Sequence, residues 1–130
     1  MPHIRAIFPQ TDRIFENDNS SQIQMFLRNN KEAIRLALAA ETDCKPEQIA
    51  LIAETIPHWL VSCSDNLLSL EFVIDVGSKC VGKPVEVATG FRKRILQLMR
   101  GDSLTGIKFG VWVRVMAENH YTEYDPNNLE

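Results

Sequence analysis

A run of alternating side chains, LLSLEFVIDVG from Leu67 to Gly77, is the strongest structural signal in this sequence. Every second residue in it is apolar, whereas Ser69, Glu71 and Asp75 stand among the residues between them. Successive side chains of a β-strand point to opposite faces of a sheet, so this pattern buries one face and leaves the other more polar. The segment therefore predicts a strand in a sheet that is covered on one side.

Two further segments show the spacing of amphipathic helices. Apolar residues recur at helical intervals from Ser20 or Ser21 to about Thr42, and Asn30 is the one polar interruption of that face. A second helix is predicted over Pro84–Arg100, with a proline at its start and a glycine just beyond its end. This arrangement is the preferred one at helix termini.

Shorter apolar segments predict three more strands, two of which are ended by proline. They cover His3–Phe8, stopped by Pro9, then Gln48–Glu54, closed by Pro57, and finally Lys108–Ala117. The resulting order is β-α-β-β-α-β. We expect an α/β or α+β fold in which a four-stranded mixed sheet carries two helices on one face.

The two halves of the chain resemble each other. The first strand begins at residue 3 and its helix near residue 21, and the third strand begins at residue 67 and its helix at residue 84. The halves also close alike, because IAETIPHW (Ile52–Trp59) and VMAENHY (Val115–Tyr121) each lead from a strand through Ala-Glu to a histidine and an aromatic residue. We expect one domain over residues 1–130, built from a repeat of residues 1–65 and 66–121 with a tail of residues 122–130.

Composition argues against several classes of protein. The net charge of −3 and the lack of a Lys/Arg-dense tract predict no nucleic-acid partner, and the short run Arg92–Arg94 is typical of a solvated helix face. No apolar run is long enough to span a membrane and no signal-peptide stretch is evident, so we expect a cytoplasmic protein without a membrane partner. Metal sites and disulfides are not expected either, because the cysteines and histidines lack the spacing of ligands or pairs: Cys44, Cys63, Cys80, His3, His58 and His120.

The first residues, MPHIRAIF, suggest a specific chemistry. A methionine followed by a small residue such as proline is usually trimmed, which leaves Pro2 with a secondary amine. An N-terminal amine titrates at about 7.7–8.0, and burial or a nearby cation lowers that value further. Such a nitrogen can abstract protons near pH 7. With Met1 attached, however, the Pro2 nitrogen is a tertiary amide and cannot act as a base. Pro2 would then only begin an edge strand.

The MPHI start and the paired strand ends IAETIPHW and VMAENHY resemble the tautomerase superfamily, which includes 4-oxalocrotonate tautomerase, 5-carboxymethyl-2-hydroxymuconate isomerase and macrophage migration inhibitory factor. The nearest likeness is to a small uncharacterised bacterial branch that begins Met-Pro-His-hydrophobic. The resemblance implies a homotrimer with active sites between subunits. It also implies the amino-terminal proline as catalytic base and no metal or other cofactor.

The same resemblance assigns roles to further residues. Pro2 takes the position of the base, and Trp59 and Tyr121 hold the places of aromatic residues that close an apolar pocket around it. The candidate cations for an anionic or carbonyl substrate are Arg114, Arg5 and Lys79, although the strand IALIA has no arginine where some relatives have one. For Arg114 a salt bridge is the alternative role, and for Arg5 a position inside an oligomer.

Three interpretations follow from the sequence. The first is a cofactor-free keto–enol tautomerase or isomerase acting on a small carbonyl or 2-hydroxy-dienoate compound. In it a cationic side chain would stabilise the enolate oxygen. The second is a trimeric scaffold or ligand-binding protein that keeps the fold without the chemistry. A regulatory domain with the ferredoxin-like split βαβ fold is the third.

Overall fold

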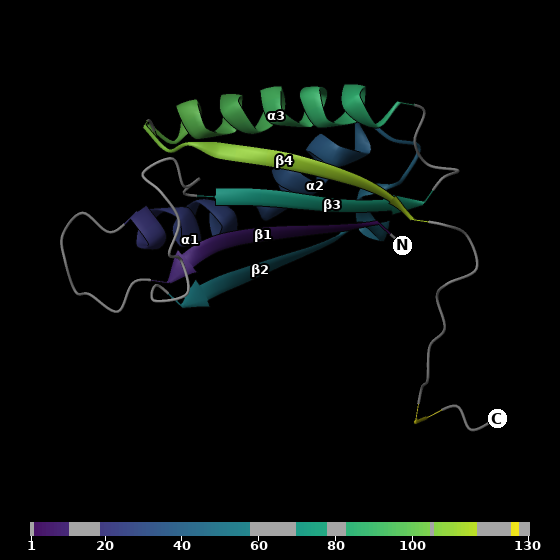
Figure 1. Ribbon diagram of the computed structural model, residues 1–130, viewed down its shortest axis with the longest axis horizontal. Coiled ribbons are helices and arrows are strands. Elements are labelled where there is room, and N and C mark those ends of the chain that lie inside the picture. Colours follow the sequence, from purple (N-terminus) through teal and green to yellow (C-terminus); the bar gives the residue numbers. More distant parts are fainter. Residues whose placement is uncertain are drawn as a thin grey trace.

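A mixed four-stranded sheet covered by helices on one face forms the framework of the chain (Figure 1). The computed structural model describes residues 2–10, 19–57, 70–77, 83–104, 106–116 and 126–127. The strands are β1 (His3–Gln10), β2 (Ala50–Pro57), β3 (Leu70–Gly77) and β4 (Phe109–Met116). The α-helices in this part are α1 (Asn19–Asn29), α2 (Lys31–Ala39) and α3 (Pro84–Gly101), and a short 3₁₀ helix, η1 (Pro46–Gln48), precedes β2.

The sheet is assembled from two parallel strand pairs. Its strand order is β2-β1-β3-β4, in which β1 and β2 are parallel, β3 and β4 are parallel, and β1 and β3 run antiparallel. Each half of the chain thus forms a strand–helix–strand unit, and the two units join edge to edge through β1 and β3. The predicted α+β fold with a four-stranded mixed sheet and helices on one face is confirmed.

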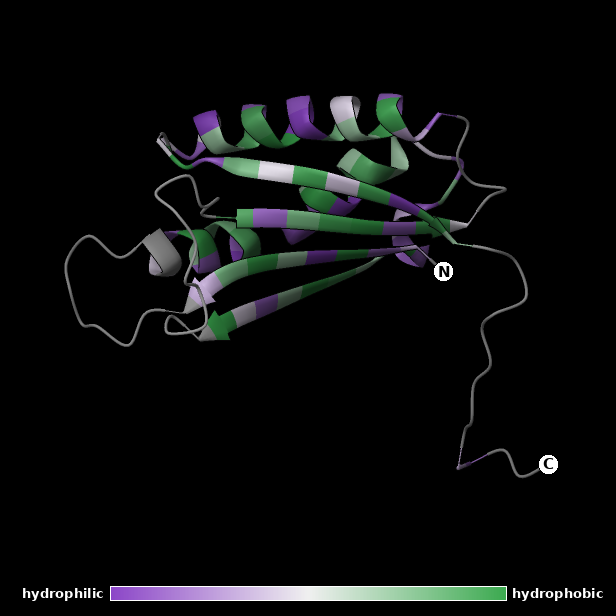
Figure 2. Cartoon of the chain, in the orientation of Figure 1, coloured by the Kyte–Doolittle hydropathy of each residue, from purple (hydrophilic) through white to green (hydrophobic). Residues whose placement is uncertain are grey.

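The core lies between the sheet and the helices. The alternation predicted for β3 is confirmed, because Leu70, Phe72, Ile74 and Val76 are all buried while Glu71 and the other intervening residues of the strand are more exposed. Figure 2 shows the corresponding bands of hydrophobic and hydrophilic residues along β3 and α3. On α3 the buried side chains are Val87, Phe91, Ile95 and Met99. The apolar faces of helix and strand therefore meet as the sequence pattern requires.

The predicted first helix is wrong in one respect, because it is divided at Asn30. The Asn30 backbone leaves the helical region, at φ −116° and ψ 17°. Its side-chain Nδ2 donates to the Phe26 carbonyl oxygen at 3.0 Å and to Asp102 Oδ2 at 2.7 Å. Asparagine side chains compete with the backbone for helix carbonyl groups, which is why a single asparagine separates α1 from α2.

Two strand boundaries also differ from the prediction. β1 continues through Pro9 to Gln10 instead of stopping at Phe8. Within the described residues its pairing with β3 extends to Ile7, and Pro9 continues the parallel pairing of β1 with β2 opposite Ile56. β2 begins at Ala50 because the turn of η1 occupies the residues before it, and the strand runs on to Pro57.

The face of the sheet turned away from the helices is called the outer sheet face here. The strand registers place the following side chains on it: His3, Arg5, Ile7, Ile52, Ile56, Val73, Asp75, Trp112, Arg114 and Met116. Large apolar side chains are exposed there, with Trp112 at 60% and Met116 at 49% of their full exposure. In the described part of the chain, none of the helices combines the length and the hydropathy needed to cross a membrane.

Candidate functional site

Pro2 lies directly before β1 and is buried. Its carbonyl oxygen accepts a hydrogen bond from the Ala50 N–H at 3.1 Å, which fixes the start of the chain against β2. Extending the two registers of β1 by one residue places Pro2 between Ile49 and Val76, both of which are buried. An amine in such apolar surroundings is desolvated, and desolvation disfavours its protonated form.

Pro2 lies at one end of the sheet, where all four strands either begin or terminate. The strands β1 and β2 begin there, and β3 and β4 end there. One residue further along, a row of paired positions crosses the whole sheet through Ala50, His3, Asp75 and Arg114. The fold therefore collects Pro2, a histidine, a carboxylate and an arginine at one end of the sheet.

Asp75 binds the two arginines that the sequence proposed as substrate ligands. Arg114 donates to it through Nε to Oδ1 at 2.6 Å and through Nη2 to Oδ2 at 3.0 Å, a two-pronged geometry that favours arginine over lysine. Arg5 Nη2 lies 3.9 Å from Asp75 Oδ2. The Arg114 hydrogen bonds hold the pKa of the Asp75 carboxyl below its usual range. The charges of Arg114, Arg5 and His3 act in the same direction, and partial burial opposes them.

The structure thus brings Arg5 and Arg114 together, but not on the face that Pro2 shares. Burial alternates along the start of β1, so Pro2 and Ile4 turn toward the helices while Arg5 turns toward the outer sheet face. Arg114 is exposed on that outer face, paired with Asp75. Within one chain, Pro2 and the two arginines therefore lie on opposite faces of the sheet.

Asp75 is not among the residues that the sequence singles out. Its only signal there is a carboxylate that stands, with Glu71, on the more polar side of the strand. Its partner could not be read from the sequence, because the register Asp75↔Arg114 depends on how β3 and β4 align. The salt bridge considered for Arg114 is present in the structure.

The Asp75 ion pairs should make stability depend on pH. A carboxyl with a lowered pKa stabilises the fold above its unfolded pKa, near 3.8, and that contribution is lost as the pH falls through the folded pKa. We expect Asp75→Asn to lower the free energy of unfolding at pH 7 by about 1 kcal/mol. Urea denaturation should show the difference from wild type narrowing below pH 3.8.

The control for this prediction is Glu71→Gln, an equivalent change on the same strand and face. No hydrogen bond or ion pair joins the Glu71 side chain to the described residues, so it should have little effect at either pH. An Asp75→Asn deficit that is the same at pH 7 and in acid would contradict the role given to the ion pairs.

Lys79, Trp59 and Tyr121 lie outside the described residues, so their proposed roles remain predictions. Among the residues that are described, no group of three or more histidine, cysteine, aspartate or glutamate side chains could hold a metal ion.

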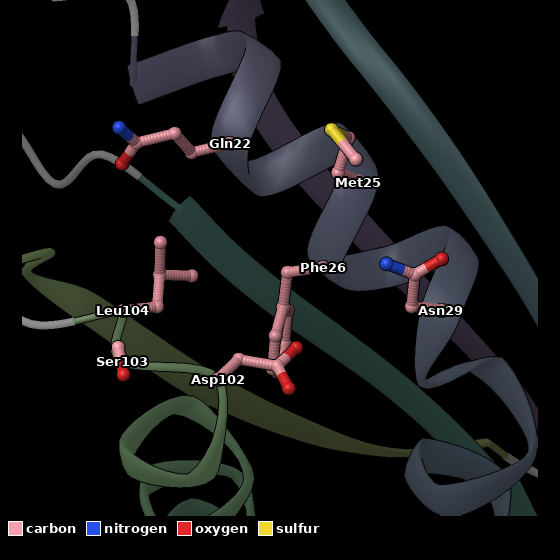
Figure 3. A pocket seen from close by; sticks show the side chains of 7 residues that line it. All are labelled: Gln22, Met25, Phe26, Asn29, Asp102, Ser103 and Leu104. Atoms are coloured by element: carbon pink, nitrogen blue, oxygen red, sulfur yellow. The ribbon is translucent and has the colours of Figure 1, made fainter.

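The described residues also enclose hollows away from Pro2. A hollow of about 380 Å³ lies between α1 and the turn after α3, where Gln22, Met25, Asn29 and Asp102 are among the lining residues (Figure 3). Another, of about 300 Å³, lies between α2 and α3. Neither is lined by Pro2, Arg5 or Arg114.

Comparison with known proteins shows which of them have a similar fold. No protein-family profile and no curated protein match the chain. Solved structures do. A fused 4-OT superposes with a TM-score of 0.61 at 6% identity, over 93% of this chain and 91% of its own. A domain of unknown function (DUF1904) from Sebaldella termitidis gives 0.58 at 16% identity, over 95% of each chain. Malonate semialdehyde decarboxylase gives 0.57 at 10% identity, over 95% of this chain and 91% of its own.

Each match covers more than nine tenths of this chain and of the other protein's chain, so the similarity extends to both halves of the fold. The chain has the tautomerase fold shared by 4-OT and malonate semialdehyde decarboxylase. The fold expected from the MPHI resemblance is confirmed. The ferredoxin-like alternative is not favoured, because the two parallel βαβ units follow one another in a single sheet.

Proposed function

We propose that this protein is a cofactor-free keto–enol tautomerase or isomerase in which Pro2 is the general base. The observation that carries the proposal is the burial of Pro2 at the end of a central strand of a tautomerase fold, between Ile49 and Val76. An amine so placed has the apolar surroundings that keep it neutral near pH 7. Malonate semialdehyde decarboxylase, which has the same fold, was solved as the wild type, in an inactivated form, and as a mutant whose own first residue, a proline, is replaced by alanine.

In the proposed mechanism, the Pro2 nitrogen removes a proton from the carbon next to a carbonyl group and returns it elsewhere on the substrate. The negative charge that develops on the carbonyl oxygen needs a nearby donor or cation. Arg5 is the stronger candidate of the two arginines, because its guanidinium lies 3.9 Å from Asp75 without hydrogen-bonding to it, whereas Arg114 is held by two hydrogen bonds. Lys79 is the third candidate, and Trp59 and Tyr121 would exclude water.

The chain is proposed to assemble as a homotrimer through the outer sheet face. Fused 4-OT proteins of the same fold were solved as asymmetric and symmetric trimers. In this chain Trp112, Met116 and Ile52 expose 60%, 49% and 43% of their surface on that face. Clustered exposed apolar side chains of this kind mark protein interfaces. Arg5 and Arg114 share this face. In the trimer, Pro2 of one subunit would therefore meet the arginines of a neighbouring subunit, which lie on the opposite face of the sheet from Pro2 within a single chain.

One experiment tests catalysis and assembly together. Untagged protein whose intact mass shows Met1 removed should convert phenylpyruvate or 2-hydroxymuconate and should sediment as a trimer. The matched control carries one additional residue ahead of Pro2, which turns the nitrogen into an amide. It should sediment identically and lose the activity. Equal rates in the two proteins would reject Pro2 as the base, and a monomer would reject the assembly.

The alternative function is a trimeric scaffold or ligand-binding protein without catalysis. The observation that favours it is the pairing of Arg114 with Asp75, together with the absence of arginine from β2, since both reduce the cations free to bind an anionic substrate. A trimer that is inactive even after Met1 removal would support this alternative.

A further inference from the structure

The hollow between α1 and the turn after α3 lies at the end of the sheet opposite to Pro2. β3 and β4 begin at that end, where Leu70 pairs with Phe109, and Pro2 lies beside their other ends. Figure 3 shows Gln22, Met25 and Asn29 of α1 on one side of the hollow and Asp102, Ser103 and Leu104 of the turn on the other. Its volume of about 380 Å³ is within the range of small-molecule sites.

Asp102 is the only ionisable side chain that lines this hollow among the described residues. Its Oδ2 accepts a hydrogen bond of 2.7 Å from Asn30 Nδ2, and Asn30 is itself held because the same amide donates to the Phe26 carbonyl. The other carboxylate oxygen, Oδ1, accepts no hydrogen bond from a described residue. The residue that divides α1 from α2 thus also fixes the orientation of Asp102 and leaves one oxygen available.

The helices around the hollow add to its negative potential. α1 ends at Asn29 and α3 ends at Gly101, so the carbonyl ends of two helices converge on Asp102. A helix C-terminus carries a partial negative charge and favours cations. Arg28 and Arg100 stand in the last turns of these helices, but neither lines the hollow. The lining therefore has the electrostatics of a cation site.

Ser103 holds the backbone conformation that shapes the turn. The Ser103 N–H donates to the Arg100 carbonyl and the Leu104 N–H to the Met99 carbonyl, which is the hydrogen-bond pattern of a Schellman C-cap. The residue at the left-handed position of this motif, here at φ 55°, is most often glycine. A serine at this position places a hydroxyl group beside Asp102 in the lining, where a glycine would have none.

The remaining lining is apolar. Met25 exposes 59% of its surface over the hollow, Phe26 is buried behind it, and Leu104 is half-buried on the opposite wall. A ligand that covers Met25 would remove apolar area from water, which favours binding.

We propose that this hollow binds a small organic cation, an ammonium compound with a short apolar group. Its ammonium would donate to Asp102 Oδ1, with the Asn29 carboxamide and the Ser103 hydroxyl as further polar partners, and Gln22 lines the far end of the hollow. Its apolar group would pack on Met25 and Leu104. The site is separate from Pro2 and does not depend on the proposed tautomerase activity.

The test uses 2-phenylethylamine as the probe and the full chain labelled with ¹⁵N. At about 10 mM amine, amide signals should move in residues 22–30 and 102–104, with a dissociation constant in the millimolar range. The matched probe 3-phenylpropanoate has the same ring and the opposite charge, so it should leave these signals in place. Absent shifts, or equal shifts with both probes, would overturn the proposal.

Three variants measure separately how much the Asp102 charge and the apolar Met25 surface contribute to amine binding. Asp102→Asn keeps an acceptor for Asn30 and should weaken amine binding on the order of 10-fold. Asp43→Asn makes the same change of net charge at an exposed position away from the hollow and should bind like wild type. Met25→Ala, at a side chain already exposed, should weaken binding a few-fold without affecting the fold. Equal affinities in Asp102→Asn and Asp43→Asn would show that the amine binds elsewhere.

Discussion

Replacing Pro2 by alanine is expected to lower kcat/KM for the enol–keto conversion of phenylpyruvate on the order of 10²-fold or more, because positioned general bases contribute rate factors of that size. Alanine still offers an amine once Met1 is removed, but that amine is primary and no longer fixed by a ring packed between Ile49 and Val76. A misplaced base loses much of its effect. Steady-state kinetics on protein of verified intact mass provide the measurement.

The control for this prediction is Pro9→Ala, which makes the same substitution at the other end of β1. Pro9 is half-buried beside β2 and has no proposed part in the reaction, so its rate should match wild type. The pH profile adds a second readout. The base acts in its neutral form, so wild-type activity should fall as the pH drops below the pKa of the amine. Equal rates in Pro2→Ala and wild type would leave only the scaffold function.

Local patterns predict most of the fold correctly, because β3 and α3 owe their burial to their own periodicity. The errors occur where a distant contact decides the outcome. Asn30 divides the first helix and bonds to Asp102, a residue 72 positions away. The sequence predicts a strand stop at Pro9, yet β1 passes through it and stays paired with β2 as far as Gln10. Contacts of this kind cannot be read from the spacing of residues along the chain.

The candidate site is predictable to a smaller extent. Pro2 can be identified because its chemistry follows from its position in the sequence. Its separation from Arg5 also follows from the sequence in principle, since residues an odd number of positions apart on a strand face opposite sides. The ion pair between Arg114 and Asp75 does not follow from the sequence, because it depends on the register between β3 and β4. The hollow beside Asp102 likewise joins two segments that no sequence motif connects.

The stability of the whole arrangement should depend most on Phe72, whose side chain is fully buried at the centre of the sheet. Its ring meets Phe91 of α3 edge to face at a centroid distance of 5.4 Å and Phe109 of β4 at 6.2 Å. Phe72→Ala removes both contacts and leaves a cavity between helix and sheet. We expect a loss of about 3–5 kcal/mol in the free energy of unfolding, a large part of the 5–15 kcal/mol typical of a domain.

Urea denaturation at one protein concentration would measure this loss, since assembly would otherwise change the apparent stability. Val85→Ala is the exposed control on α3, where 73% of the side chain is already in water, and it should shift stability by no more than about 0.5 kcal/mol. A Phe72→Ala loss as small as the control's would mean that α3 is not held to the sheet by this aromatic cluster.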